Sequence, residues 1–597
     1  MKYSSNLRLN LKKFSLLISL TSVIVSFSSC NSGNNYSGDS TQVAGNLRLL
    51  SQNERAQDFD QLIALFKTFY GPYEYKQKRI SVDIDRLASS LRDQAVNAKT
   101  DEEFAGYIKQ IGAALKDGHV QISIKNTSSG ISRYSIPLLL TPVENSVLVT
   151  DIDPQLSTEM NIVKGDEVLE VDGKSPQSYM PTILKYDGWA TELSSKHAIY
   201  NLLSRPSYMT DLIPTQTSVT LKLKKADGAI VIQEVPWVLR KYNADLDKML
   251  KPLPSILDLK VKLADDMNSV VGKASVMEMG SNDPFFISGS AQKKFNFIKA
   301  YPSDSARKKA GLAEAEKPPI YSALYRYQSK NILLMRNASY SPSDFSSAVY
   351  MKAYQALLTE YQDMADVLVL DQTHNPGGSY CSQFYELFAK EGDSQAVQKC
   401  NADRKWINNL LIEWPAQAQT LKLTWNGRVS QAQAAKVEKA YDNGVRLSEA
   451  IPIFTDNNLV DATKSVWKKP MIVLIDELAG SCGDVFPMLV KANKRAILFG
   501  QQTMGLGGNV ENVGTLNNSR ISVSMTRGLF TAYKADGNYV ESDFVENNGV
   551  MPDITYSHTV KDFRAGYVDY IKAFSDEAIK IEATEAAKKI EVKEEKK

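Results

Sequence analysis

A strand-to-helix turn of small residues, at 477–483, constrains this chain more than any other stretch. Residues 471–476 before it are apolar or isosteric with apolar groups and predict a buried strand, and residues 484–493 predict a helix with one apolar face. Such a turn can raise a serine hydroxyl into a cleft, while the first amides of the helix point toward a developing negative charge. Ser481 is therefore a candidate nucleophile, and a tight loop without chemistry is the alternative for the turn taken alone.

The length and charge of the chain narrow its class. Its 597 residues are enough for several domains and a sizeable core. A hydrophobic fraction of 43% and a charged fraction of 23% are typical of a soluble globular protein. Because 70 basic residues balance 68 acidic ones, we expect no nucleic acid or other polyanion as a partner.

Residues 1–30 resemble a bacterial lipoprotein signal. A basic start precedes an apolar run at 14–27, which is too short to span a bilayer, and the segment ends at Cys30. In such a signal Cys30 carries the lipid and becomes the first mature residue; cleavage by the general signal peptidase is the alternative. Residues 31–50 are then a flexible tether. We therefore expect an exported protein, periplasmic or anchored to the outer membrane, whose only membrane contact is the lipid.

Export into an oxidising compartment makes the remaining cysteines candidates for a disulfide. Cys381 and Cys400 lie close in sequence within one inserted region, so they either pair or remain free thiols. Cys482 follows the candidate nucleophile and is expected to pack as a small apolar residue.

Residues 51–127 predict a helical N-terminal domain, because apolar residues recur there at spacings of three and four. Ser81 or Asp83 and, further on, Thr100 are expected as helix N-caps. The last helix ends in the sequence Asp-Gly-His-Val before an alternating strand. His119 in that junction is a candidate general base, and a surface or hydrogen-bonded structural histidine is the alternative.

Residues 128–240 predict a β domain with a hairpin whose turn is Asp227-Gly228. The segment 161–176 resembles the glycine-aspartate turn and following strand of PDZ domains, which bind extended peptide ends at a sheet edge. A longer helical stretch is expected between residues 177 and 208, and a purely structural β module is the alternative. Residues 241–318 predict an insertion or linker with some helix and no assigned chemistry.

Residues 319–560 predict an α/β sheet domain. Two strands and a helix lead into a buried strand that ends in Gly377 and Gly378, as in a right-handed crossover unit. Residues 379–470 are expected as an insertion within this domain, a further strand is expected at 520–529, and residues 561–597 form a charged helical tail.

Three blocks, taken together and in order, resemble the tail-specific or C-terminal processing serine peptidases and their tricorn-like relatives. The blocks are VLVLDQTHNPGG at 367–378, VLIDELAGSCGDVFPMLVKANKRAILFGQQTMGLGG at 473–508 and VENNGVMPDI at 545–554. This resemblance implies an α/β fold with a crotonase- and ClpP-like peptidase core, preceded by a helical segment and a PDZ-like domain.

The resemblance also implies roles for site residues. Ser481 falls at the nucleophile position, and the amide of Cys482 with an amide of Gly377 or Gly378 would form the oxyanion hole. The processing-peptidase branch has a lysine base 25 residues beyond the serine, where this chain has Leu506. A leucine cannot accept a proton, so a Ser-Lys dyad is not expected.

The tricorn-like branch places a histidine before the PDZ-like domain and a glutamate late in the core, and these positions match His119 and Glu546. A serine that precedes the histidine in that branch is Gly118 here. His374 is a second candidate base, although it matches no base position of the family.

We therefore predict an exported serine endopeptidase that acts on extended polypeptides through Ser481 and His119, without a metal or other cofactor. One alternative is an inactive peptide- or ligand-binding protein on the same scaffold. Another is an α/β-hydrolase esterase, although the turn lacks the first glycine of the G-x-S-x-G pattern. The sequence predicts no oligomeric state.

Overall fold

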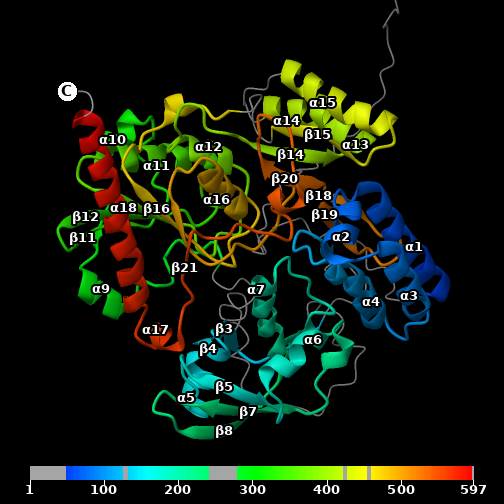
Figure 1. The fold of residues 1–597 in the computed structure, drawn as a ribbon. Helices are drawn as coiled ribbons and strands as arrows, with labels where there is room; N and C mark the ends of the chain where they lie inside the picture. The colour runs from blue at the N-terminus through cyan, green and yellow to red at the C-terminus, as the bar shows by residue number, and fades with distance from the viewer. Residues whose placement is uncertain (1–48, 125–131, 241–278, 421–426, 453–458, 595–597) are drawn as a thin grey trace, which may run out of the picture.

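The structure is a computed structural model that describes residues 49–124, 132–240, 279–420, 427–452 and 459–594. The predicted signal, nearly all of the predicted tether and the first part of the predicted linker lie outside these residues. No described helix is both long and apolar enough to cross a membrane. Figure 1 shows the helical N-terminal region, a β-rich domain and a sheet-centred core arranged around one another.

A seven-stranded sheet forms the centre of the core, in the order β10-β11-β12-β13-β16-β17-β21. The strands from β12 to β21 run parallel, whereas β10 and β11 are antiparallel additions at one edge. The strands are β10 (Ile298–Lys299), β11 (Ser322–Tyr327), β12 (Lys330–Arg336), β13 (Val367–Asp371), β16 (Met471–Ile475), β17 (Ile497–Gly500) and β21 (Ile554–Thr555).

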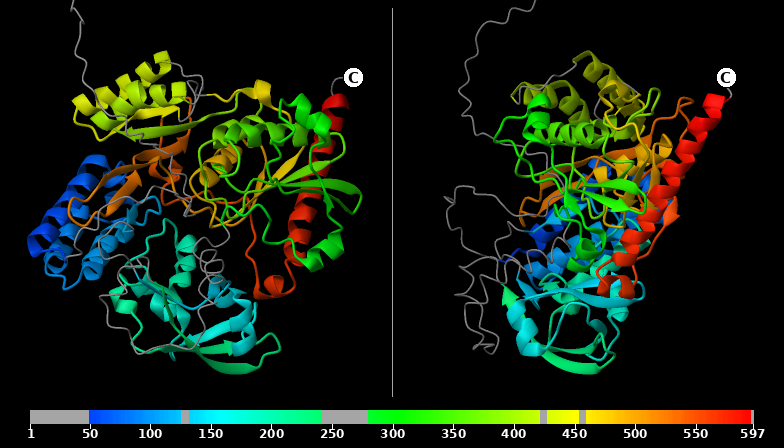
Figure 2. Two further views of the ribbon diagram at one scale, coloured as in Figure 1. Left: turned by 180° about the vertical axis from the view of Figure 1, so that it is seen from behind. Right: turned by 90° about the vertical axis from the view of Figure 1, so that its left-hand side faces the viewer.

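Both faces of this sheet are buried, which explains why β13 and β16 are continuous apolar runs. Alternate residues of β13 enter two separate cores: Val367 and Val369 pack toward α18, and Leu368 and Leu370 pack toward the opposite helices. Figure 2 shows α18 lying along one side of the sheet. The covering helices are α18 (Val568–Glu594) with α9 (Gly289–Phe295) on one face, and α11 (Ser347–Tyr361), α12 (Cys381–Glu386) and α16 (Cys482–Ala492) on the other.

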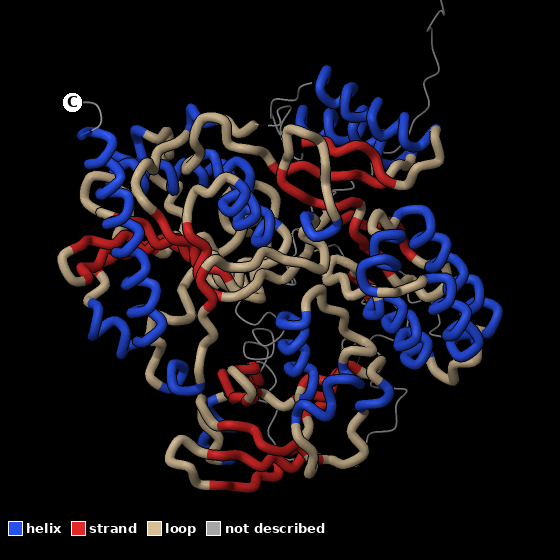
Figure 3. The backbone as a smooth tube through the Cα atoms, viewed as in Figure 1, coloured by secondary structure: helices blue, strands red, loops and turns tan. Residues whose placement is uncertain are grey.

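Because the central strands are parallel, their carboxyl ends meet at one edge of the sheet. The loops that leave there are 372–380 after β13, 476–481 after β16 and 501–509 after β17. In open α/β sheets this edge is where ligands bind. The segments singled out from the sequence are therefore brought together by the strand order itself. Loops occupy the centre of the molecule in Figure 3.

The N-terminal region consists of four helices that share a core with a small sheet ordered β1-β19-β18. Asp83 caps the third helix through Arg86 N and Thr100 caps the fourth through Glu103 N, whereas Ser81 ends the second helix in a left-handed conformation. The elements are α1 (Gln52–Phe69), α2 (Tyr73–Ile80), α3 (Ile84–Val96), α4 (Asp101–Ala114), β1 (Gln121–Ser123), β18 (Val510–Thr515) and β19 (Ser522–Thr526).

The β-rich domain contains a five-stranded sheet ordered β3-β4-β5-β7-β8 and a three-stranded sheet ordered β6-β2-β9. β7 and β8 form the predicted hairpin. The helical stretch expected between 177 and 208 is a series of short helices that ends in strand β6. The elements are β2 (Arg133–Ser135), β3 (Leu138–Val143), β4 (Ser146–Ile152), α5 (Pro154–Met160), β5 (Glu167–Val171), η1 (Pro176–Tyr179), α6 (Met180–Ile183), α7 (Glu192–Ser195), η2 (Lys196–Leu202), β6 (Ser204–Pro206), η3 (Thr210–Leu212), β7 (Ser218–Lys224), β8 (Ile230–Pro236) and β9 (Val238–Arg240).

The insertion contributes a third small sheet, ordered β15-β14-β20. The single strand expected at 520–529 is instead two strands that belong to different sheets, β19 and β20. Arg527 lies between them, fully buried, and forms ion pairs with Asp403 and Glu511. These elements are β14 (Ala396–Asn401), α13 (Arg404–Asn408), η5 (Asn409–Glu413), α14 (Trp414–Thr420), α15 (Gly427–Asp442), β15 (Leu447–Pro452), η6 (Ala462–Lys464) and β20 (Gly528–Ala532).

Three further short elements complete the described core: α10 (Asp304–Lys309), η7 (Glu541–Asp543) and α17 (Val560–Arg564).

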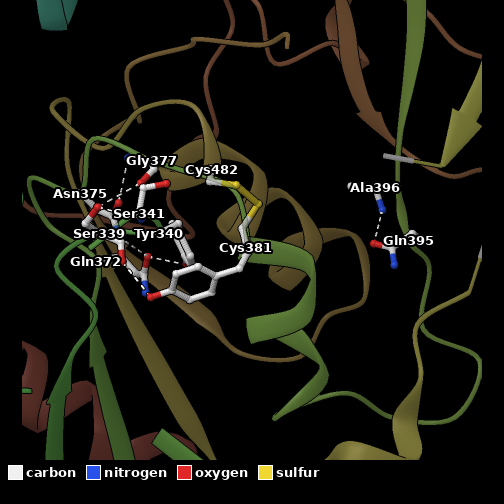
Figure 4. The surroundings of a disulfide bond; sticks show 11 residues. Ser339, Tyr340, Ser341, Gln372, Asn375, Gly377, Cys381, Gln395, Ala396 and Cys482 are labelled. Atoms are coloured by element: carbon white, nitrogen blue, oxygen red, sulfur yellow. Dashed lines mark hydrogen bonds between the residues drawn. A yellow bond between two sulfur atoms is a disulfide. The ribbon is translucent and has the colours of Figure 1, made fainter. Parts of the chain in front are cut away.

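The cysteine pairing differs from the expectation. Cys381 forms a disulfide with Cys482, so Cys482 is not the unpaired apolar residue expected, and Cys400 is a buried free thiol. Figure 4 shows the bond joining the start of α12 to the start of α16. The partners are 101 residues apart, and the parallel sheet brings them close because both helices cover the same face. Proximity in sequence favoured Cys400, but that residue lies in β14 beside β20.

Replacing Cys381 with serine is expected to lower the free energy of unfolding by about 2–4 kcal/mol, because the disulfide closes a long loop. Reductant should destabilise the wild type by a similar amount and leave Cys381→Ser unchanged. Denaturant unfolding with and without reductant measures both effects. Cys400→Ala is the matched control, which should retain the response to reductant. A bridged peptide joining Cys381 to Cys400 in a non-reducing digest would contradict this pairing.

Candidate active site

Ser481 occupies a strained turn between the end of β16 and the start of α16. Its backbone has φ 56° and ψ −118°, a conformation that residues with a Cβ rarely adopt. Two short bonds hold the turn, from Gly483 N to Gly480 O at 2.7 Å and from Gly480 N to Asn375 O at 2.9 Å. Strain of about 1–3 kcal/mol at such a residue persists only where the surroundings enforce it. The turn therefore fixes the direction of one partly buried hydroxyl.

The glycine turn after β13 lies directly against Ser481. A Cβ added at Gly377, which has φ +100°, would lie 2.6 Å from Ser481 Cβ and 2.8 Å from the Cys482 amide nitrogen. Gly378 makes an equally close approach to the backbone of Tyr340 and Ser341. No side chain fits at either position, which explains why two glycines follow each other here.

The predicted oxyanion donors are not equivalent. The Gly377 amide donates to Asn375 Oδ1 at 2.9 Å, so this donor is already used. Within the described residues, no acceptor is hydrogen-bonded to the amides of Cys482 or Gly378. Cys482 begins α16, so its amide also lies at the positive end of the helix dipole. The geometry thus favours Cys482 and Gly378 as anion donors, and Gly377 as the residue that allows the close approach.

The segment after β17 connects the serine turn to the rest of the site. Asp484 in α16 accepts hydrogen bonds from Thr503 Oγ1 and from the amides of Gly505 and Leu506, the latter two at 2.9 Å. Burial raises the pKa of Asp484 to about 6, and these donors oppose the rise. The next amide, that of Gly507, donates to Glu546 Oε2 at 2.8 Å.

Leu506 separates the serine turn from the histidine turn. A Cβ added at Gly118 would lie 2.9 Å from Leu506 Cδ2, and one added at Gly480 would lie 3.1 Å from Leu506 Cδ1. The glycines that precede His119 and Ser481 therefore face the two methyl groups of one side chain, and neither position has room for a Cβ without a shift of Leu506. Leu506 occupies the position of the lysine base in the processing-peptidase branch, but here it has a packing role. Gly118 leaves room for its side chain.

His119 is fully buried at the junction between α4 and β1. Its amide donates to Asp117 Oδ1 at 2.9 Å, and Asp117 Oδ2 accepts from Tyr70 and Thr526. Neither ring nitrogen has a hydrogen-bond partner among the described residues. Burial lowers the pKa of His119, the Lys76 charge lowers it further, and the Asp117 charge opposes both. The imidazole is therefore held neutral, with its proton-accepting nitrogen unused.

Glu546 lies in the same buried cluster but does not hydrogen-bond to His119. Its carboxylate pairs with Lys76 of α2 and accepts from Gly507, and both charged side chains are fully buried. Burial and the Asp117 charge raise the pKa of Glu546 to about 7, while Lys76 and the Gly507 amide oppose the rise. Sequence reasoning missed Lys76, since α2 carries no pattern that marks one lysine among several.

His374, the second candidate base, is placed differently. Its Nε2 lies 3.2 Å from Asp476 Oδ2 and its ring stacks on Phe285 with centroids 4.7 Å apart. Burial and the charge of Arg336 lower the pKa of His374 to about 3, so it is a weak base. No group of three or more His, Cys, Asp or Glu residues within the described ranges is arranged to hold a metal ion.

A cavity of about 300 Å³ opens beside the glycine turn. It is lined in part by Gly280, Ser339, Ser341 and Asp344, and Ser341 is the residue whose backbone touches Gly378. A side chain of a bound polypeptide would fit into this space.

Taken together, a parallel α/β sheet, a strained serine at a helix N-terminus, free backbone amides and a buried neutral histidine are typical of serine hydrolases. Residues 317–556 match the sequence model of Peptidase family S41. Over these residues the chain is therefore similar to the S41 family of serine peptidases.

The chain is also similar to individual proteins over most of its length. The chain is 25% identical over 588 residues to a Chlamydia pneumoniae protein, with 89% of this chain and 91% of the relative covered. It is also 25% identical over 574 residues to an uncharacterised protein of Chlamydia muridarum. The structure of mature CPAF complexed with lactacystin has a similar fold, with a TM-score of 0.67 and 20% identity over 89% of this chain and 99% of that one.

Gly377→Ala is expected to reduce peptidase activity about 100- to 1000-fold, comparable to the loss of one oxyanion donor, because the new methyl group would displace Ser481 and the Cys482 amide. Gly392→Ala is the matched control, since Gly392 also has a positive φ, of +87°, but no atom within 4 Å of the added Cβ. Both variants carry the cost of a side chain at positive φ, and only Gly377→Ala should add the clash and lose activity. Equal losses of activity would contradict this role of Gly377.

Proposed function

We propose that this protein is a serine endopeptidase that cleaves extended or unfolded polypeptides, with Ser481 as nucleophile and His119 as general base. The observation that carries the proposal is the presence of a strained serine turn together with a buried imidazole whose ring nitrogens have no hydrogen-bond partner in the described structure. Leu506 packs between the two turns, which places both turns against one side chain.

In the proposed reaction, Ser481 Oγ forms a bond to the scissile carbonyl carbon while His119 takes the hydroxyl proton. The carbonyl electron pair moves to oxygen, where the amides of Cys482 and Gly378 stabilise the charge. The carbon–nitrogen bond then breaks and His119 returns the proton to the leaving amine. Water activated by His119 hydrolyses the acyl-enzyme. Glu546 would stabilise the imidazolium once the proton has moved.

The substrate is proposed to lie along the glycine turn. A side chain on its acyl side would enter the cavity lined by Ser339, Ser341 and Asp344. The β-rich domain is a further candidate for peptide binding, by the PDZ-like resemblance of segment 161–176. It contacts the core near the site, since His197 Nε2 lies 2.9 Å from Glu477 Oε1.

We further propose that the protein is exported and anchored by a lipid at Cys30, as a periplasmic or outer-membrane lipoprotein. The support is the pattern of residues 1–30 and the polar residues that follow. The disulfide between Cys381 and Cys482 is consistent with an oxidising compartment.

A fluorophosphonate probe, used with unfolded casein as substrate, tests the catalytic proposal. Ser481→Ala should lose both labelling and cleavage. His119→Ala should slow labelling about 100- to 10,000-fold, the usual contribution of general acid–base catalysis. His374→Ala removes the same kind of side chain and should retain most of the wild-type rate, because His374 is held by Asp476 and is a weak base.

The reverse order of the two histidine variants would make His374 the base. A wild type that neither labels nor cleaves would favour the binding-protein alternative, which equilibrium binding of unfolded peptides would then test. Hydrolysis of small esters without any peptide cleavage would favour the esterase alternative.

The anchoring proposal predicts that Cys30→Ala abolishes incorporation of radiolabelled palmitate. The reason is that only a cysteine at this position can carry the lipid. The variant should move from the membrane fraction to the soluble fraction, and Cys400→Ala should not. Palmitate labelling that persists in Cys30→Ala would contradict the anchor.

A further inference from the structure

Lys76 is a fully buried ammonium group that comes from outside the peptidase domain. Its three N–H donors meet three acceptors: the Glu546 carboxylate, Asn547 Oδ1 at 2.6 Å and the carbonyl of Lys116 at 3.2 Å. Lys116 precedes His119 by three residues, and Asn547 follows Glu546. One side chain of α2 thus holds both the histidine turn and the glutamate loop.

Burying the charged Lys76 side chain at this contact costs desolvation free energy. Removing an ammonium from water costs several kcal/mol, and an apolar residue of similar volume often packs as well or better. The two segments are also already joined without Lys76, because Asn547 Nδ2 donates to Lys116 O at 2.7 Å and to Ala190 O at 2.9 Å. Packing alone therefore does not account for the positive charge.

The electrostatic surroundings of Glu546 account for the positive charge of Lys76. Burial and the Asp117 charge favour the neutral form of Glu546. Among the described residues, Lys76 is the only cation that contacts this carboxyl group. The titratable groups that surround the cluster are Tyr70 after α1, Tyr75 and Lys76 of α2, and Asp117 and His119 of the turn after α4. Tyr75 donates to the Glu546 carbonyl at 2.7 Å, so it does not neutralise the carboxylate.

We infer that Lys76 is a positioning residue for the proposed proton transfer, which keeps Glu546 ionised and holds it in register with the His119 turn. This inference rests on the proposed function of Ser481 and His119. Lys76 would act on the reaction through Glu546, through the turn and through the effect of its charge on His119, since it touches no reacting atom. Lys76 is not itself placed to act as a general base, because its nitrogen is fully hydrogen-bonded.

The sign of the pH effect follows from these contacts. Removing the ammonium raises the pKa of Glu546, because the cation that opposed its protonation is gone. It also raises the pKa of His119, whose protonation Lys76 opposes. Both changes leave more of the site in its inactive, protonated form at neutral pH. The acid limb of the activity profile should therefore move to higher pH.

The test measures the rate of fluorophosphonate labelling between pH 5 and pH 9 in the full-length protein. Lys76→Met should lose roughly 100-fold at pH 7, the lower range of general acid–base contributions, and recover in part at higher pH. Lys76→Gln keeps a hydrogen-bond donor without the charge and should show the same shift of the acid limb. It therefore tests the inference even if Lys76→Met misfolds. Arg79→Met is the matched control, because Arg79 lies on the same helix and donates to Asn548, yet is exposed and does not touch Glu546.

A double-mutant cycle separates positioning from a general structural effect. In a Glu546→Gln background, Lys76→Gln should cost clearly less than it does in the wild type, because the carboxylate is absent and only the effect of the Lys76 charge on His119 remains. The full loss in that background, or a uniform loss with an unchanged pH profile, would overturn the inference while the wild type remains active. An unreactive wild type would instead overturn the proposed function, and this inference with it.

Discussion

The buried carboxylate of Asp484 is the interaction on which the arrangement of the site depends. A carboxylate without water must be met by donors, and here three of them come from the segment after β17. Because Asp484 lies in the first turn of α16, those bonds fix residues 503–506 relative to Ser481. The same segment then supplies the Gly507 amide to Glu546 and the Leu506 side chain between the serine turn and the histidine turn. One buried charge therefore sets the distances among three separate loops.

The position of Leu506 shows how the site is divided between parts of the chain. The S41 match covers 317–556, which contains Ser481, the glycine turn and Glu546. His119 and Lys76, however, belong to the N-terminal helical region. A leucine at 506 cannot supply chemistry, but it fills the space between Gly118 and Gly480, so that a histidine turn from another region can be seated there. The peptidase domain alone would then hold a serine, an oxyanion site and a carboxylate, but no base.

The sequence could predict what local patterns determine. The serine turn between a buried strand and an amphipathic helix, the caps at Asp83 and Thr100 and the β7–β8 hairpin all follow from short-range rules, and the structure contains them. Features that depend on contacts between distant segments could not be predicted. Lys76 reaches Glu546 across 470 residues, and the Cys482 partner is 101 residues away. The use of the Gly377 amide by Asn375 depends on a loop conformation that no periodicity encodes.

The disulfide between Cys381 and Cys482 also gives the chain a covalent ring. The ring contains the insertion helices α13–α15 and strands β14 and β15, and its two ends meet next to Ser481. Fluctuations that open part of the insertion therefore cannot separate α12 from α16, because a covalent bond rather than packing closes the ring. Evolution could lengthen, shorten or reshape the insertion without altering the geometry around the serine, so this part of the molecule is free to diversify while the reaction centre stays fixed.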